Sequence, residues 1–149
     1  MLALLTASCE QQAERKAIKK VAYSYLDAMA NFRIDDAIPF ASQQTREQTI
    51  PFAKNFLLAN TDTSVILAST PASIVIDSIK VGNDTAIVSY TETNPLRVKM
   101  STITAIKEEG QWVIDVPLIL PAFMGGNGGE IQMPDSTETL PANLSQSGQ

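Results

Sequence analysis

The sequence predicts an α+β domain in which N-terminal helices pack on a curved, four-stranded antiparallel sheet. Two observations predict it. In roughly the first sixty residues, apolar side chains recur every three or four positions, which is the period of an amphipathic helix. After Pro71 they alternate with polar residues, and turn sequences at 82–84 and 109–110 divide this half into short strands. Helices followed by hairpin-connected strands are typical of an α+β fold.

Three helical segments are expected in the first half. Residues 10–30 place their apolar side chains on one face of a helix. A turn or two of helix is expected from about Asp35, because Pro39 is tolerated only near a helix start. The third pattern begins at residue 42 or 44 and runs to residue 60, with Pro51 in its first turn or at a kink.

Polar residues at 60–63 end the helical half, and four strands follow. The expected strands are 74–81, 85–92, 97–107 and 111–116. They hold β-branched and aromatic residues that suit a half-buried sheet. Turn sequences separate them, so neighbours in the chain are expected to be neighbours in the sheet. Asp77 and Asp115 fall at polar positions of the alternation, where we expect them to face solvent.

Residues 121–149 differ in composition from the rest of the chain. They are rich in Gly, Pro, Ser and Thr, and their acidic residues are accompanied by no Lys or Arg. Such a segment buries too little apolar surface to offset the entropy of ordering, so a flexible acidic tail is expected. The alternative is that its apolar residues dock on the sheet or on a partner: Ile131, Met133, Leu140 and Leu144. The sequence thus predicts one folded domain at residues 10–120.

Residues 1–9 read MLALLTASC and end at the lone cysteine, Cys9. The stretch is short for a signal peptide and has no basic start, so either the true start lies upstream or the stretch is something else. Thr6-Ala7-Ser8-Cys9 resembles the lipobox of bacterial lipoproteins, in which a diacylglycerol is attached to the cysteine, although Thr6 stands where Leu is commonest. We expect a lipid on Cys9 to anchor the protein to a membrane. The alternative is an unmodified cysteine.

Composition excludes several kinds of function. The chain has 149 residues, no His, one Cys and a formal net charge of −5 from 11 basic and 16 acidic residues. Without imidazole there is no Ser-His-Asp triad and no His general base. A single Cys forms no internal disulfide and no cysteine-clustered metal site. The acidic balance argues against nucleic-acid binding. The sequence predicts no metal site and no cofactor.

Four local sequences and the order of elements resemble the nuclear transport factor 2-like fold, a cystatin-like fold. They are AYSYLDAM at 22–29, DDA at 35–37, VGNDTAIVSY at 81–90 and KEEGQWVIDV at 107–116. A cystatin-like domain of another kind is the alternative. With Cys9, the chain resembles small lipoproteins of uncharacterised function from Gram-negative bacteria. The resemblance implies a pocket between the first helix and the sheet, and a place in the bacterial cell envelope, at the periplasmic or outer surface.

The resemblance leaves two functions open. The first is a non-enzymatic lipoprotein whose domain binds a small apolar ligand or a partner protein. The second is an enzyme similar to ketosteroid isomerases or polyketide cyclases, with an Asp base and a Tyr donor in the pocket. No residue set here matches such an enzyme's motif, so no catalytic residue is assigned and the first function is preferred. The pocket candidates are Tyr25, Met29, Phe40, Phe56, Tyr90 and Trp112. For both tyrosines, packing in the core is the alternative.

Two surfaces are candidates for further contacts. The open face of the sheet is where a homodimer would form. Arg15, Lys16, Lys19 and Lys20 form a basic cluster just after Cys9, at a spacing that lets them touch anionic lipid head groups. The alternative is that this cluster is only a solvated helix face.

Overall fold

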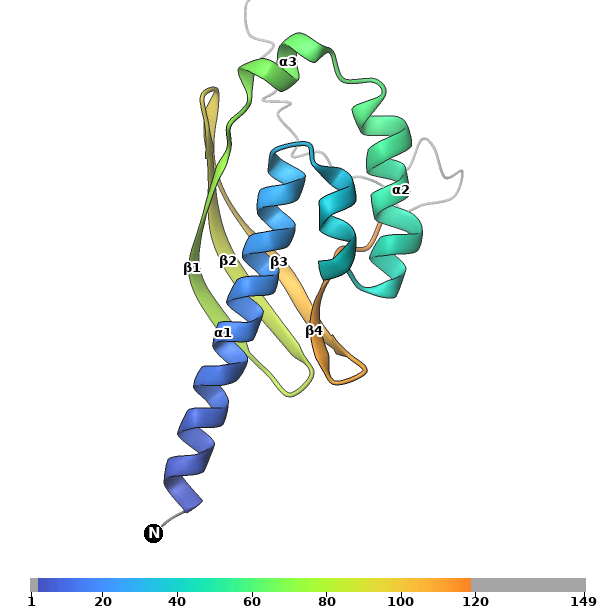
Figure 1. Ribbon diagram of the computed structural model, residues 1–149. Coiled ribbons are helices and arrows are strands. Elements are labelled where there is room, and N and C mark those ends of the chain that lie inside the picture. The colour runs from blue at the N-terminus through green and yellow to red at the C-terminus, as the bar shows by residue number, and fades with distance from the viewer. Residues whose placement is uncertain (1–2, 119–149) are drawn as a thin grey trace, which may run out of the picture. The chain divides into compact units, whose positions relative to one another are not determined.

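A computed structural model describes the backbone of residues 3–118 and the side chains of residues 8–118 (Figure 1). The predicted tail at 121–149 lies outside the described residues. The elements are α1 (Ala3–Ala30), η1 (Ile34–Phe40), η2 (Thr45–Thr49), α2 (Ile50–Phe52), η3 (Ala53–Leu58), α3 (Thr63–Ala68), β1 (Ser73–Val81), β2 (Thr85–Asn94), β3 (Arg97–Glu108) and β4 (Gln111–Asp115). The predicted α+β class is confirmed, and so are the four strands.

Helix α1 begins at Ala3, seven residues before the predicted start. Ala and Leu are strong helix formers, so the short apolar stretch continues the helix instead of preceding it. Burial begins only at Ile18, and residues 8–12 are all exposed. The N-terminal part of α1 accordingly projects beyond the sheet (Figure 1). From Ile18 onward, buried Ala22, Tyr25 and Leu26 pack on the sheet at helical spacing.

A Schellman turn ends α1. Phe32 adopts a positive φ of 59°, and its N–H donates to the Met29 carbonyl at 3.2 Å while Arg33 N–H donates to the Ala28 carbonyl at 2.8 Å. The side chain of Asn31 then bonds both polar groups of Ala72, donating at 3.0 Å and accepting at 2.8 Å. This pair of bonds ties the end of α1 to the start of β1.

The third helical region is one stretch built from η2, α2 and η3, and its outer two parts are π-helices. Pro51 lies within α2, where its missing N–H removes one α-helical hydrogen bond. Helix α3 was not predicted. Asp62 caps it by accepting from the Ser64 N–H at 3.0 Å, which lowers the pKa of Asp62. With six residues and no buried one, α3 has too little apolar periodicity to be recognised.

The sheet is antiparallel in the order β1-β2-β3-β4. Its inner face carries buried residues at alternate positions: Ile74 on β1, Ala86, Val88 and Tyr90 on β2, Ala105 on β3, and Trp112 and Ile114 on β4. The register between β1 and β2 shifts between Ile76 and Ser78. The β3–β4 turn uses Glu109 and Gly110, both at positive φ, as a tight hairpin requires.

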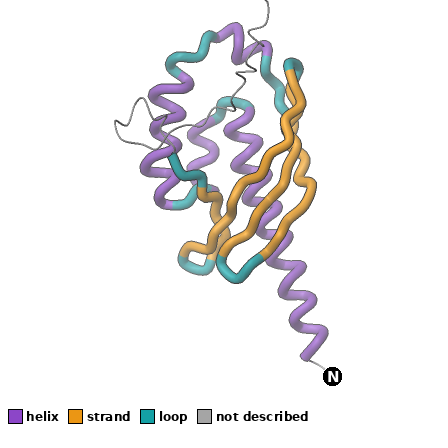
Figure 2. Tube along the Cα trace, turned by 180° about the vertical axis from the view of Figure 1, so that it is seen from behind, coloured by secondary structure: helices purple, strands orange, loops and turns teal. Residues whose placement is uncertain are grey.

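All described helices lie on one side of the sheet (Figure 2). On the strands, Val75, Ile87, Val98 and Met100 are exposed, with 79% of the Met100 side chain accessible. The predicted homodimer through the open face stays a prediction. Among the described residues, no helix is both long and apolar enough to span a lipid bilayer.

A hydrogen-bonded seam joins the third helical stretch to β4. Ser42 N–H donates to the Ile114 carbonyl at 2.8 Å, and the Ser42 hydroxyl lies 2.6 Å from Asp115 Oδ1. Thr45, which is fully buried, accepts from the Val116 N–H at 2.8 Å, and its hydroxyl lies 2.9 Å from the Ser42 hydroxyl. The prediction that Asp115 only faces solvent is therefore wrong, because the loop after η1 crosses beside β4 and supplies a donor to it. Asp77 is exposed, as predicted.

Candidate functional site

A cavity of about 730 Å³ opens between α1, the third helical stretch and the sheet. Its walls are mostly apolar. They include Leu26, Met29 and Ala30 from α1, Phe52, Ala53 and Leu57 from the third helical stretch, Val65 from α3, Tyr90 from β2 and Ile103 from β3. Cavities of this size hold small organic molecules.

Two phenols line the cavity. Tyr25 comes from α1 and Tyr90 from the centre of β2, and their side chains are 3% and 7% exposed. Neither hydroxyl is hydrogen-bonded to another described residue. Burial raises the pKa of Tyr25 to about 12, and the nearby Tyr90 adds to the rise. Each of these tyrosines is therefore both a buried core residue and part of the cavity wall.

Stability should depend on Tyr25 in alkaline solution. The unfolded pKa of 10.0 lies below the folded value, so the contribution of Tyr25 is complete below pH 10 and is lost as the pH rises toward 12. Between about pH 9 and pH 11, we expect the free energy of unfolding to fall by about 1 kcal/mol more in the wild type than in Tyr25→Phe. Urea denaturation at both pH values measures this. Tyr23→Phe, at a 46% exposed tyrosine, should behave as the wild type; equal pH dependence in Tyr25→Phe and wild type would contradict the assignment.

Charged groups stand where β2 and β3 line the cavity. Glu92 on β2 is the register partner of Lys99 on β3. Arg97, the first residue of β3, also lines the cavity. No aspartate is among the described residues that line the cavity. The site therefore combines an apolar interior and two hydroxyl donors with a carboxylate and two cations.

Phe32 lines the cavity in a strained conformation. Its φ of 59° is in the left-handed region, which is unusual for a bulky residue that is not glycine. A glycine would end α1 with less strain, but it would remove an aromatic wall from the cavity. Phe32 was missed because its sequence context indicates only the end of a helix.

The structure brings three of the six pocket candidates together. Tyr25, Met29 and Tyr90 line the cavity, whereas Phe40, Phe56 and Trp112 do not. Phe40 packs against the core, and Phe56 is 43% exposed and stacks on Phe52 with ring centroids 5.0 Å apart. Phe52 lines the cavity, whereas Phe56 was the predicted lining residue. The helical pattern contained both phenylalanines, and periodicity alone did not separate them.

Trp112 belongs to the core that α1 covers from Ile18 onward. It is 7% exposed, and its indole Nε1 is buried with no hydrogen-bond partner among the described residues. Lys107 Nζ lies 5.3 Å from the ring centroid and donates to Glu14 at 2.6 Å. Trp112 therefore packs as a core residue with a cation over its ring.

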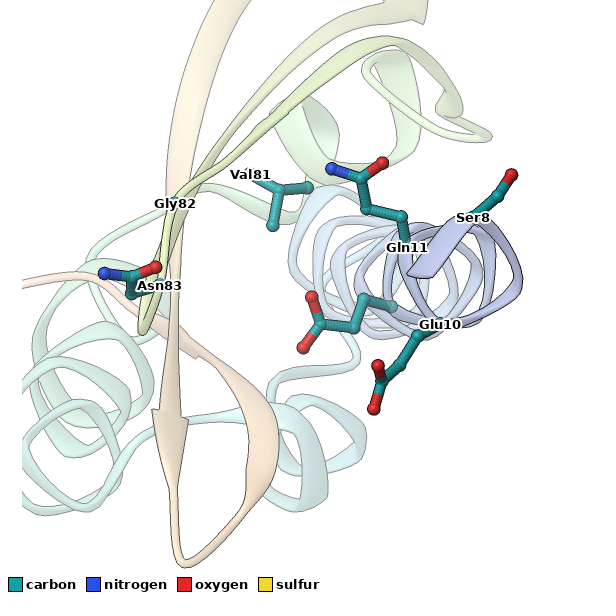
Figure 3. A pocket seen from close by; sticks show the side chains of 7 residues that line it. Ser8, Glu10, Gln11, Val81, Gly82 and Asn83 are labelled. Atoms are coloured by element: carbon teal, nitrogen blue, oxygen red, sulfur yellow. The ribbon is translucent and has the colours of Figure 1, made fainter. Parts of the chain in front are cut away.

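A second hollow, of about 700 Å³, lies beside the N-terminal part of α1 (Figure 3). Its labelled side chains are mostly polar: Ser8, Glu10 and Gln11 come from α1, and Asn83 comes from the β1–β2 turn. It lacks the enclosing apolar walls of the first cavity. Within the described part of the chain, no three acidic or cysteine side chains cluster as metal ligands would. The cavity with the two phenols is the better candidate site.

Sequence comparison finds no matching family model and no matching curated protein. Structural comparison does find neighbours. A Campylobacter jejuni crystal structure described as an NTF2-like transpeptidase superposes with a TM-score of 0.50 at 10% identity, covering 66% of this chain and 96% of its own. The fold is NTF2-like. An NTF-2-like protein of unknown function from Shewanella oneidensis MR-1 matches with a TM-score of 0.46 at 17% identity, covering 68% of this chain and 93% of its own.

The predicted resemblance to the nuclear transport factor 2-like fold is thus confirmed. At these identities the likeness establishes the fold alone. An NTF2-like domain of this kind fits a binding module or an enzyme, and the choice between them depends on the residues of the cavity.

Proposed function

We propose that this NTF2-like domain is a non-enzymatic binding domain that a lipid on Cys9 anchors in a bacterial cell envelope. Its ligand is a small, largely apolar molecule with an oxygen atom that accepts a hydrogen bond from Tyr25 or Tyr90. One observation carries the ligand proposal: a cavity of about 730 Å³ has apolar walls and two phenols without partners among the described residues. A phenol that lines an apolar cavity can donate a hydrogen bond to an acceptor on a ligand there.

The charges beside the cavity narrow the ligand class. Arg97 and Lys99 outnumber Glu92 there, so a ligand with a weakly acidic end is favoured over a cationic one. The apolar interior supplies most of the binding free energy, at about 25 cal/mol for each Å² of apolar surface removed from water. The neutral phenol of Tyr25 then orients the oxygen atom of the ligand.

Binding is favoured over catalysis because the described lining of the cavity does not include the expected aspartate base. An isomerase- or cyclase-like enzyme would need an aspartate directed at the phenols, and the described lining residues include none. The lining carboxylate is Glu92, whose cross-strand partner is Lys99.

The position of Cys9 supports the anchor. The cysteine is exposed, and it belongs to the part of α1 where residues 8–12 make no buried contact with the sheet. A diacylglycerol on Cys9 could therefore enter a membrane without disturbing the core, which begins at Ile18.

A matched pair of substitutions on α3 tests the ligand proposal. Val65 lines the cavity at 48% exposure, whereas Leu67 on the same helix is 69% exposed and does not line it. We expect Val65→Trp to weaken binding of anilinonaphthalene sulfonate, an aromatic anion, by about tenfold, since the indole occupies space in the cavity. Fluorescence titration measures this.

Leu67→Trp is the control for that titration, because it adds the same indole outside the cavity. Its affinity for the dye should stay within about twofold of the wild type. Equal affinities for all three proteins, or a failure of the wild type to bind, would contradict a ligand site in this cavity. Native mass spectrometry of protein extracted from its own host would then show which small molecule, if any, is retained.

A further inference from the structure

A groove runs between α1 and β1, on the other side of α1 from the third helical stretch (Figure 1). It consists of two hollows of about 550 and 300 Å³ that share Lys16, Lys19 and Ile76 as lining residues. Lysines and Tyr23 from α1 form one wall, and β1 forms the other, where Ile74 is buried in the core and Ile76 is half-buried. The Arg15 guanidinium donates to the Ile79 carbonyl at 2.7 Å and so fixes one end of the groove.

The lysines of this groove have no anionic partners in the described part of the chain. Arg33, Lys54 and Lys107 each form an ion pair elsewhere, but Lys16, Lys19 and Lys20 form none. All three are exposed. The carboxylate that lines the groove, Asp77, accepts a hydrogen bond from the Thr91 hydroxyl at 2.7 Å. The groove is therefore a strip of net positive charge beside β1.

The spacing along α1 aligns this strip with Cys9. At about 100° per residue, Lys16, Lys20 and Tyr23 lie within about 40° of the direction of Cys9 around the helix axis. Lys16 and Lys20 follow Cys9 by about 10 and 16 Å along that axis, at about 1.5 Å per residue. One exposed face of α1 thus carries the cysteine, two lysines and a tyrosine in succession.

We propose that this face of α1 and the groove beside it dock on the surface of a membrane that contains acidic phospholipids. Phosphate groups lie against Lys16, Lys19 and Lys20, the Tyr23 ring lies at the level of the head groups, and the half-buried Ile76 contacts the apolar parts below them. Lysines near an anionic membrane surface and aromatic rings at its interface are favourable in this arrangement. The contact does not require a lipid on Cys9.

An acidic peptide is the other anionic partner that such a groove could take, and β1 argues against it. A peptide would add as a strand to the free edge of β1, but the register shift between Ile76 and Ser78 interrupts that edge, and Lys80 follows. Bulges and lysines on edge strands oppose the addition of further strands. A fluid lipid surface needs no such regular edge.

The test uses full-length protein with Cys9→Ser, so that acylation does not contribute to binding. Vesicles of phosphatidylglycerol with phosphatidylcholine should sediment this protein, and vesicles of phosphatidylcholine alone should not. Adding Lys16→Gln and Lys20→Gln should lower the partition coefficient about 25-fold, because each lysine near the anionic surface contributes about fivefold. Raising the salt concentration should weaken the binding as well.

A second double variant, Arg46→Gln with Lys54→Gln, is the matched control. It removes the same charge from the third helical stretch, on the other side of α1, and should lower the partition coefficient by less than about threefold. Equal losses in both double variants would overturn the proposal in favour of a general charge effect. Binding to soluble polyglutamate but not to vesicles would overturn it in favour of an acidic peptide. Circular dichroism verifies that each variant is folded.

The vesicle-binding result does not depend on whether Cys9 carries a lipid. Failure of vesicle binding in the Cys9→Ser protein would leave acylation of the wild-type cysteine possible, whereas loss of the anchor alone would leave the lysine-dependent binding intact.

Discussion

Cys9→Ser is expected to move the protein from the membrane fraction of its host into the aqueous phase, with at least a 100-fold change in the ratio between the two. A serine hydroxyl cannot form the thioether that holds the diacylglycerol. Each buried methylene contributes about 0.8 kcal/mol, so the loss of two long acyl chains removes far more binding free energy than the lysines of α1 can supply. Detergent phase partitioning followed by immunoblotting measures the distribution.

Ser8→Ala is the matched control for the Cys9 experiment. It changes the neighbouring exposed residue but keeps a small side chain before the cysteine, so the protein should remain in the detergent phase. A wild-type protein in the aqueous phase would contradict the anchor, as would a Cys9→Ser protein that stays in the detergent phase. The Lys16→Gln and Lys20→Gln double variant with Cys9 intact should also stay anchored.

Thr45→Val should destabilise the folded protein by about 2–4 kcal/mol. Valine has nearly the shape of threonine, but it cannot accept the hydrogen bond that the Val116 N–H donates at 2.8 Å, and it cannot donate to the Ser42 oxygen, which lies 2.9 Å from the Thr45 hydroxyl. Thr45 is fully buried, so the Val116 N–H would lose its acceptor with no replacement from the valine side chain. Urea denaturation at neutral pH gives the change in the free energy of unfolding.

The same substitution at Thr102 provides the comparison. Thr102 is exposed on β3, and its hydroxyl makes no hydrogen bond to another described residue, so Thr102→Val should change the stability by less than about 0.5 kcal/mol. If Thr45→Val were as stable as Thr102→Val, the seam between the third helical stretch and β4 would not be a stabilising network.

The strands and the buried face of α1 were predictable because their periodic patterns repeat over many residues. Ile18, Ala22 and Leu26 repeat at four-residue intervals, and alternation extends over several residues in each strand. The turn at Glu109-Gly110 was predictable for a different reason: a tight hairpin needs positive φ, and glycine adopts it without strain. These are local constraints, and a single sequence expresses them.

Less of the candidate site was predictable. Tyr25, Met29 and Tyr90 were found because each falls on an apolar face that turns toward the interior. Phe32 and Val65 were missed, since Phe32 lies in a Schellman turn and Val65 lies in the short helix α3. Both line the cavity because tertiary packing places them beside residues of α1 and β2. No local sequence pattern specifies that placement.

Local periodicity and turn chemistry thus determine the α+β class, the order of the strands and the face of α1 that is buried, since each depends on residues a few positions apart. Cys9 and the lysines that follow it are likewise properties of one continuous segment. The tertiary structure alone decides that Ser42 meets Asp115, that Tyr25 and Tyr90 share a cavity, and that the lysines of α1 border β1. Ser42 and Asp115 are 73 positions apart, and Tyr25 and Tyr90 are 65 positions apart. The lysines of α1 are about 55 to 60 positions from the residues of β1 that they border. Contacts over such separations form only when the whole domain packs.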